Sequence, residues 1–330
     1  MLVGPVMFGT VAFAIAAAVG GLAFSGQAAS APSVKALTLT IRDPHVGRLS
    51  FQAIAAGDPA AARTGRLVLF LHGFPETADS FRQILPAVAS AGYYAVAFSQ
   101  RGYSPGARPR SVAAYNIIDL VGDVTRVAAR LGARSFHLVG HDWGGGVAWV
   151  AAALYPGLVS SVMVLATPYP DALSAAITDP ENPQHAASAY MAVFREPGSA
   201  RRILSDGVEG FKALFALGGG VVTAATIDAY ARTMATPAAL GAAMNWYRAN
   251  PFPTPALGTT KVRAVYLWGS GDATFLLSTA QATAQYVKGP YTFCELPGKG
   301  HWLPEDAGPQ IVQTLLPELA GRQPRCPAAS

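Results

Sequence analysis

Short apolar runs alternate with longer amphipathic stretches along residues 36–170. "ALTLTI" and "LSFQAIA" alternate apolar and polar positions, which predicts an opening hairpin with one face on a core. Apolar runs separated by helical stretches then follow, a rhythm typical of a parallel sheet covered by helices on both faces. The predicted buried strands are "RLVLFL" (66–71), "YYAVAFS" (93–99), "SFHLVG" (135–140) and "VSSVMVLAT" (159–167), and a long helix is predicted over Val112–Leu131 with Ser111 as its cap.

The rhythm changes between residues 171 and 255, where no strand pattern is convincing and helical stretches such as "TAATIDAYARTM" follow one another. Strands and helices return over residues 256–322, and residues 323–330 form a tail. We therefore expect an α/β fold with a mostly parallel central sheet flanked by helices, and a helical cap domain inserted over 171–255. Ligands bind outside the carboxyl ends of the strands in such sheets, so a cap placed there would enclose a pocket.

The first 34 residues contain no charged side chain, and the first 24 are apolar and rich in Ala and Gly. Small residues follow, with cleavage sites for export after Ala28 or Ala31. The apolar stretch is also long enough to span a bilayer, and no Lys or Arg precedes it. Residues 1–31 are thus expected to be either a cleaved signal peptide or an uncleaved membrane anchor. Both place the remaining chain outside the cytoplasm, in the periplasm or secreted.

The cysteines, the net charge and the absence of known cofactor motifs limit which partners and cofactors can be expected. Cys294 and Cys326 are expected either to form a disulfide that ties the C-terminal tail to a late strand or to stay free. A formal net charge of +5 with scattered arginines gives no sign of a nucleic-acid partner. The sequence has no P-loop, no GxGxxG after a strand, no CxxC and no HExxH, so no metal or organic cofactor is expected. The oligomeric state stays open.

The stretch "HLVGHDWGGGVAW" predicts a strand, a very tight turn and a helix, with Asp142 at the tip of the turn. Gly140 and Gly144 stand two positions away on each side, where a bulky side chain would clash. One interpretation of Asp142 is a simple helix N-cap. The other is a nucleophile, because a carboxylate is ionised at neutral pH and needs no base to attack an electrophile. A carboxylate suits displacement at saturated carbon, since the resulting ester can later be cleaved by water.

Hydrolysis of such an ester needs a base and a group that orients the base. His301 follows the last predicted strand, at the sheet end that also carries Asp142. Asp272 follows the preceding strand, and its alternative is a turn or capping residue; Asp171 is the second candidate for the acid. The remaining histidines are interpreted as structural: His45, His72, His137, His141 and His185.

The loop "HGFPE" after the first parallel strand faces the turn that carries Asp142 in the predicted sheet. The backbone N–H groups of Phe74 and Trp143 can point to one place and form an oxyanion hole, worth about 3–4 kcal/mol per donor in a buried site. An ordinary Gly-Pro turn is the alternative interpretation of this loop.

The motifs "HGFP", "GHDWGG", "WGSGD" and "GHW", in this order, resemble the epoxide hydrolases of the α/β-hydrolase superfamily over roughly residues 36–319. The resemblance implies an α/β-hydrolase fold and a catalytic triad of nucleophile Asp142, acid Asp272 and base His301. Haloalkane and fluoroacetate dehalogenases share much of this pattern. The sequence departs from the family at Ser99, where relatives often have an acidic residue, and at Tyr169, where they often have His.

The resemblance also implies two tyrosines that hold the epoxide oxygen. "AYMAVFREPG" matches the first such segment and places Tyr190 in this role, and "MNWYRANP" places Tyr247. A neutral phenol can donate a hydrogen bond and a proton to the alkoxide that ring opening creates. Without the resemblance, both residues would be interpreted as aromatic residues of the hydrophobic core.

The sequence thus predicts an exported hydrolase that converts a small apolar epoxide and water to a vicinal diol through a covalent ester on Asp142. The alternatives are a haloalkane or haloacetate dehalogenase with the same nucleophile, and a catalytically silent secreted binding protein. A serine esterase is disfavoured because Ser104 does not lie in a turn between a strand and a helix. Substrate identity and stereochemistry stay open.

Overall fold

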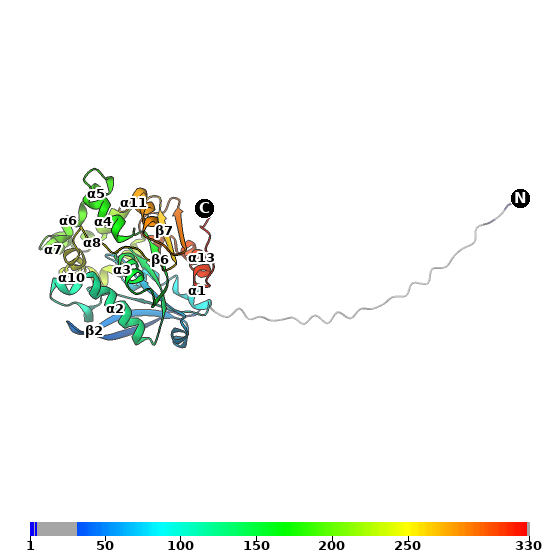
Figure 1. Ribbon diagram of the computed structural model, residues 1–330, viewed down its shortest axis with the longest axis horizontal. Coiled ribbons are helices and arrows are strands. Elements are labelled where there is room, and N and C mark those ends of the chain that lie inside the picture. Colours follow the sequence, from blue (N-terminus) through cyan, green and yellow to red (C-terminus); the bar gives the residue numbers. More distant parts are fainter. Residues whose placement is uncertain (3, 5–31, 329–330) are drawn as a thin grey trace. The chain divides into compact units, whose positions relative to one another are not determined.

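The computed structural model describes residues 1–2, 4 and 32–328 of the chain (Figure 1). The predicted signal peptide or anchor over residues 1–31 falls almost entirely outside the described residues. Within the described ranges, no helix has the length and apolar character needed to cross a membrane.

An eight-stranded sheet forms the centre of the fold, in the order β1-β2-β4-β3-β5-β6-β7-β8. β1 and β2 form an antiparallel hairpin whose second strand pairs antiparallel with β4, and every pairing from β4 to β8 is parallel. The expected α/β fold with a mostly parallel sheet is confirmed. The strands are β1 (Lys35–Asp43), β2 (Gly47–Ala56), β3 (Leu67–Leu71), β4 (Tyr94–Phe98), β5 (Phe136–His141), β6 (Val159–Leu165), β7 (Ala264–Gly269) and β8 (Tyr291–Leu296).

Helices cover both faces of the sheet, as expected for strands that are apolar on both sides (Figure 1). On one face lie α2 (Ile117–Arg130) and α3 (Trp143–Leu154), and on the other lie α1 (Leu85–Ser90) and α13 (Gly308–Leu319). Every residue of β3 is buried. Two apolar clusters, one on each side of the sheet, therefore form the core. α11 (Leu277–Ala282) and α12 (Leu303–Asp306) complete the second half of the core.

The predicted single helix over Val112–Leu131 is wrong, because the chain interrupts it at Asn116. A 3₁₀ turn spans Val112–Tyr115, and Asn116 then adopts an extended conformation with φ −64° and ψ 152°. The Asn116 side chain accepts hydrogen bonds from the N–H groups of Ile118 and Asp119, each at 3.1 Å, and so caps α2. Ser111, the predicted cap, makes no such hydrogen bond.

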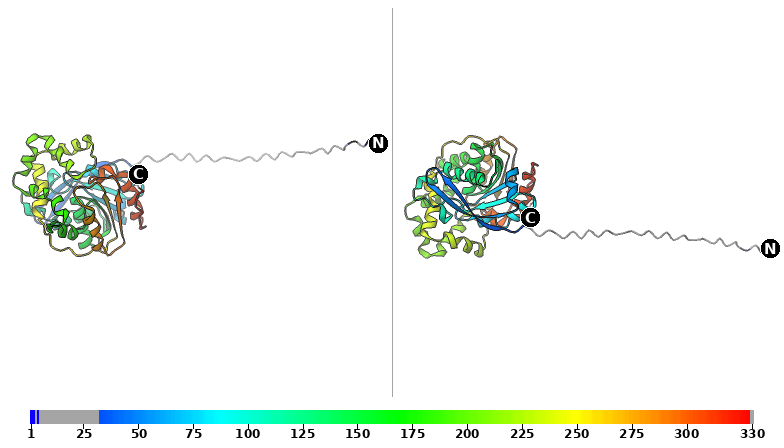
Figure 2. Two further views of the ribbon diagram at one scale, coloured as in Figure 1. Left: turned by 90° about the horizontal axis from the view of Figure 1, so that it is seen from above. Right: turned by 90° about the horizontal axis from the view of Figure 1, so that it is seen from below.

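A run of helices lies between β6 and β7, and the described residues of this run contain no strand. The green to yellow helices of this helical insertion gather on one side of the sheet in both views of Figure 2. The division into a separate cap domain at residues 171 and 255 stays a prediction. The helices of the insertion are α4 (Pro170–Thr178), α5 (Pro183–Ala187), α6 (Tyr190–Arg195), α7 (Ser199–Ile203), α8 (Val208–Ala213), α9 (Ala224–Met234) and α10 (Pro237–Ala249).

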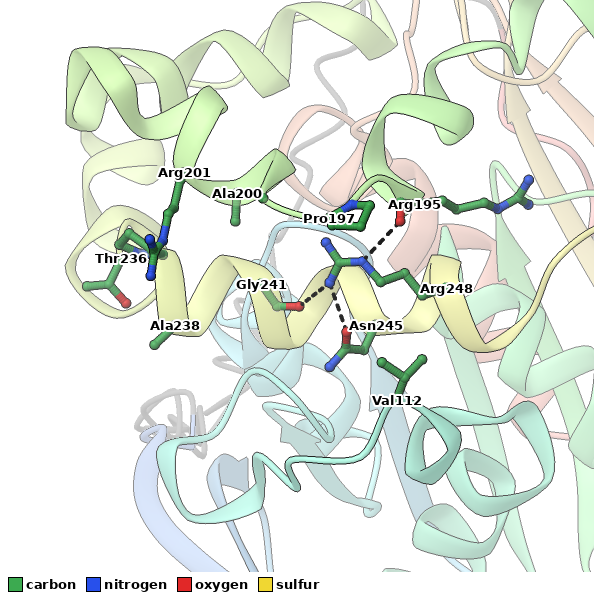
Figure 3. A pocket seen from close by; sticks show the side chains of 12 residues that line it. Val112, Arg195, Pro197, Ala200, Arg201, Thr236, Ala238, Gly241, Asn245 and Arg248 are labelled. Carbon is green, nitrogen blue, oxygen red and sulfur yellow. Dashed lines mark hydrogen bonds between the residues drawn. The ribbon is translucent and has the colours of Figure 1, made fainter.

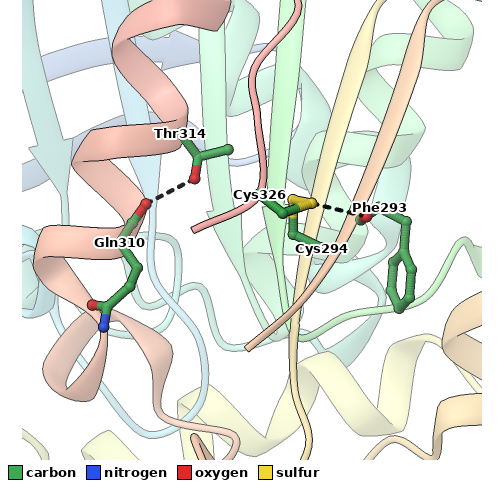
Figure 4. The surroundings of a disulfide bond; sticks show 5 residues. All are labelled: Phe293, Cys294, Gln310, Thr314 and Cys326. Atoms are coloured by element: carbon green, nitrogen blue, oxygen red, sulfur yellow. Dashed lines mark hydrogen bonds between the residues drawn. A yellow bond between two sulfur atoms is a disulfide. The ribbon is translucent and has the colours of Figure 1, made fainter. Parts of the chain in front are cut away.

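A disulfide joins Cys294 in β8 to Cys326 in the tail that follows α13 (Figure 4). The structure therefore holds the bonded form of the two that the sequence left open. The bond closes a segment with a sequence separation of 32 residues. It fastens the C-terminal tail to the last strand, as the sequence suggested.

Candidate active site

Asp142 occupies the tip of the turn between β5 and α3, in a backbone conformation rare for a residue with a side chain (φ 48°, ψ −122°). The turn is possible only because its neighbours lack side chains. A Cβ at Gly140 would lie 2.3 Å from the carbonyl oxygen of Gly144, and a Cβ at Gly144 would lie 2.1 Å from that of Leu71. The Asp142 side chain makes no capping hydrogen bond to α3. The turn thus presents the carboxylate rather than using it to stabilise the helix.

The two oxygens of the buried Asp142 carboxylate have different neighbours. The backbone N–H of Phe74 donates to Oδ1 at 2.8 Å, and the nearby N–H of Trp143 favours the ionised carboxylate. Oδ2 lies 3.8 Å from Nε2 of His301. Burial raises the pKa of the Asp142 carboxyl, while His301, His141 and the two N–H groups oppose this rise. Oδ1 is therefore held by a backbone donor, whereas Oδ2 lies next to His301.

The His301 ring is oriented by Asp272, which contacts the ring nitrogen that does not face Asp142. Nδ1 of His301 lies 3.1 Å from Oδ2 of Asp272, whose other oxygen accepts hydrogen bonds from the N–H groups of Thr274 and Phe275 at 2.7 and 3.0 Å. A carboxylate can only accept, so Nδ1 carries the hydrogen and Nε2 is left to take a proton. The structure brings Asp142, Asp272 and His301 together in one buried site.

Asp171, the second candidate for the acid, lies elsewhere. Its two carboxylate oxygens accept hydrogen bonds from the N–H groups of Leu257 and Gly258, each at 2.9 Å. Asp171 therefore holds the segment that leads from the insertion back to the sheet.

Tyr190 begins α6 and Tyr247 lies in α10, so both come from the helical insertion. The ring of Tyr247 makes edge contacts with Trp143 and Phe74 at centroid distances of 5.1 and 5.3 Å, and Phe194 packs against both tyrosines. Burial, together with the charge of Asp142, raises the pKa of each phenol well above 10. Both phenols therefore stay protonated near the Asp142 carboxylate and can donate hydrogen bonds.

A cavity of about 550 Å³ lies next to Asp142. Asp142, Trp143 and Tyr247 line it together with Met191 and Phe275, and most of its other walls are apolar. Such a space suits an apolar ligand that meets a few polar groups at one end.

A larger cavity of about 780 Å³ lies on the insertion beside α10 (Figure 3). Arg195, Arg201 and Arg248 are among its lining residues, and the Arg248 guanidinium donates to the carbonyl oxygens of Arg195 and Gly241. None of the predicted site residues lines this cavity, so its size does not make it the reaction site. In the described part of the chain, no group of three or more His, Cys, Asp or Glu side chains could hold a metal ion.

Sequence reasoning missed the buried pair of His141 and Glu76, which is bonded to the backbone of His301. Nδ1 of His141 lies 3.0 and 3.1 Å from the two oxygens of Glu76, and Nε2 of His141 donates to the carbonyl oxygen of His301 at 2.9 Å. Burial opposes a charge on His141, but the charge of Glu76 and its hydrogen bond raise the pKa of His141 to about 9. His141, interpreted from the sequence as structural, therefore holds the backbone of His301. The signal was present in "HGFPE" and "GHD", but nothing local links the two motifs.

A second buried carboxyl group, Glu305, lies near the same pair. The hydroxyl of Tyr230, from α9, donates to Glu305 Oε1 at 2.5 Å. Burial and the charge of Glu76 raise the pKa of Glu305 well above its usual range. The insertion is thus bonded to the segment that carries His301.

Comparison with known proteins gives consistent results. Residues 66–307 match the alpha/beta hydrolase fold family. Epoxide hydrolase A of Mycobacterium tuberculosis is 29% identical over 314 residues, which cover 83% of this chain and 95% of that protein. Epoxide hydrolase 4 of Mus musculus is 32% identical over 284 residues, covering 81% of this chain and 75% of that protein. The structure of Bacillus megaterium epoxide hydrolase in complex with an inhibitor superposes with a TM-score of 0.73 at 25% identity, covering 86% of this chain and all of that one.

Proposed function

The chain belongs to the alpha/beta hydrolase family and, within it, to the epoxide hydrolases, and we propose that it opens its substrate through a covalent ester on Asp142. The observation that carries this proposal is the unequal environment of the two Asp142 oxygens. Oδ1 is held by the N–H of Phe74 at 2.8 Å, whereas Oδ2 lies 3.8 Å from Nε2 of His301. Oδ2 is therefore the attacking atom, and Oδ1 becomes the carbonyl oxygen of the ester.

In the first step, Oδ2 forms a bond to one ring carbon while the bond between that carbon and the epoxide oxygen breaks. The oxygen becomes an alkoxide on the neighbouring carbon. Tyr190 and Tyr247 donate hydrogen bonds to it, and one of them gives up its proton. Their raised pKa values support this role, because both phenols hold their protons until a strongly basic oxygen appears.

In the second step, His301 takes a proton from a water molecule at Nε2, and the resulting hydroxide attacks the ester carbonyl carbon. Negative charge develops on Oδ1, which already accepts a hydrogen bond from the N–H of Phe74, and the N–H of Trp143 also favours negative charge on this carboxylate. The intermediate collapses by breaking the bond between the carbonyl carbon and Oδ2. Oδ2 leaves with the product and takes the proton that the attacking oxygen still carries, which restores the Asp142 carboxylate. The proton taken by His301 replaces the one that the tyrosine gave, so epoxide plus water yields one vicinal diol.

A parallel substrate screen tests this function against its rivals. The purified protein is incubated with styrene-type epoxides, aliphatic epoxides and haloalkanes, and diol and halide are measured. Diol formation without halide release is the expected result. Halide release without diol would establish a dehalogenase, and turnover of neither class by a folded protein would favour a silent binding protein.

We further propose that the protein acts outside the cytoplasm on a small apolar epoxide. The uncharged first 34 residues and the disulfide between Cys294 and Cys326 support export, because disulfides persist in oxidising compartments. Cell fractionation together with the N-terminal sequence of the mature protein tests export. Recovery of the full-length chain from the cytoplasm would refute it.

A further inference from the structure

Three successive glycines follow the nucleophile and its tryptophan, and only two of them are required by packing. A Cβ at Gly144 would lie 2.1 Å from the carbonyl oxygen of Leu71, and a Cβ at Gly145 would lie 2.8 Å from Cγ1 of Val164. A Cβ at Gly146 would have no atom of the described residues within 4 Å. Because glycine destabilises a helix relative to alanine, its presence at position 146 of α3 has no explanation in the packing of the protein itself.

The empty side of Gly146 is part of the wall of the 550 Å³ cavity that contains Asp142. The wall follows one stripe of α3, from Trp143 past Gly146 and Val150 to Leu154. At the rise of an α-helix, this stripe is about 16 Å long. The segment of residues 249–257, which leaves the insertion, also lines this cavity. The cavity is therefore a channel that leads from the nucleophile along α3.

The walls of this channel suit a hydrocarbon. Asp142 is the only charged residue among those that line it. The side chain of Asn250 is already used, because Oδ1 accepts from the N–H of Ile117 and Nδ2 donates to two carbonyl oxygens. At the far end, Ile118 and Leu154 are 54% and 44% exposed, so a long ligand can reach solvent there.

We propose that Gly146 is a specificity-determining position, and that the channel it opens accepts one long unbranched alkyl arm of the epoxide. The substrate class is then a terminal aliphatic epoxide with an arm of up to roughly ten carbons inside the channel, given its length. Oδ2 of Asp142 meets the ring at one end, and the arm lies past Gly146 toward Leu154. This inference rests on the proposed function for its chemistry, but the channel itself can be tested by binding alone.

The first test compares the wild type with Gly146→Met on 1,2-epoxybutane and 1,2-epoxydecane. For the wild type we expect kcat/KM to rise about two- to fourfold for each added methylene, as burial of apolar groups predicts. In Gly146→Met the side chain fills the channel beside the nucleophile. The ratio of kcat/KM for epoxydecane to kcat/KM for epoxybutane should fall at least tenfold relative to the wild type.

Two control variants separate the channel from general effects. Gly146→Ala adds a helix-favouring residue that occupies little of the channel, and it should keep most of the preference for long arms. Gly157→Met adds the same side chain at an exposed glycine that also has nothing within 4 Å of an added Cβ but does not line the cavity. Its chain-length profile should equal that of the wild type.

Binding of the diol products completes the test without catalysis. Calorimetry on the wild type should show dissociation constants of alkane-1,2-diols that tighten with each methylene, and Gly146→Met should lose this trend. If the trend is present but no epoxide is converted, the proposed function fails and the channel stands. If epoxides are converted with no dependence on arm length, or if Gly146→Met lowers all substrates equally, the channel is refuted and the proposed function stands.

Discussion

Removal of the two phenol hydroxyls by Tyr190→Phe and Tyr247→Phe, singly and together, tests the role of the insertion in ring opening. The Tyr247 ring is fixed by edge contacts with Trp143, Phe74 and Phe194, and Phe194 also packs on the Tyr190 ring. Phenylalanine retains these contacts. The substitutions therefore remove the donors and leave the shape of the site largely unchanged.

The expected magnitude follows from the state of the two phenols. Both have pKa values well above 10, because they are buried near Asp142, and so they are neutral donors to a charged alkoxide. A hydrogen bond to a charged group is worth about 1.5–3 kcal/mol, which corresponds to about a 10- to 150-fold loss of alkylation rate for each single variant. The double variant should lose on the order of 10²- to 10⁴-fold, the range of general acid catalysis.

The assay is a single turnover with enzyme in excess, quenched at intervals, in which mass spectrometry measures ester on the peptide that contains Asp142. Formation of the ester should slow, whereas its hydrolysis should be nearly unchanged. Tyr169→Phe is the matched control: the Tyr169 ring stacks on Tyr286 at 5.2 Å, and its buried hydroxyl has no hydrogen-bond partner in the part of the chain that the structure describes. An ester formation rate within threefold of the wild type in the double variant would refute the assignment of both tyrosines.

Three further outcomes are expected. His301→Gln should accumulate the ester, seen as the mass of the epoxide added to the Asp142 peptide; an unmodified peptide after reaction with an epoxide would contradict covalent catalysis. The Asp142 carboxyl must be ionised to attack, and burial raises its pKa, so kcat/KM should fall with decreasing pH at a midpoint above 3.8. A midpoint at or below 3.8 would be inconsistent with the buried carboxyl. Cys294→Ala with Cys326→Ala should lower the free energy of unfolding by roughly 3–4 kcal/mol in chemical denaturation, as expected for opening a loop with a sequence separation of 32, and an unchanged midpoint would show that the tail does not contribute.

The sheet and the nucleophile turn were accessible from the sequence because their signals are local. A strand that is apolar at every position, such as β3, is stable only in a sheet covered on both faces. Glycines on both sides of Asp142 are needed because a strand turns sharply into a helix there. Asp272 and His301 were accessible because consecutive parallel strands end at the same edge of the sheet. The break at Asn116 was missed because a capping side chain outweighed the helical periodicity of its neighbours.

The remaining parts of the site depend on contacts that no local pattern encodes. His141 binds Glu76 across 65 residues and His301 across 160, and both contacts form only when three loops meet at one sheet edge. The channel beside Gly146 also depends on distant residues, because the segment that leaves the insertion, about a hundred residues later, lines it as well. From the sequence, Gly146 was simply the third glycine of a motif.

A single turnover in water enriched in oxygen-18 tests most directly that Asp142 becomes bonded to substrate carbon. Enzyme in excess is reacted with an epoxide, and both the diol and the Asp142 peptide are weighed. Attack of water on the ester carbonyl should leave the heavy oxygen in the Asp142 carboxylate and none in the first diol. Heavy oxygen in the diol, with an unlabelled carboxylate, would show direct attack of water on the epoxide and would contradict the covalent route.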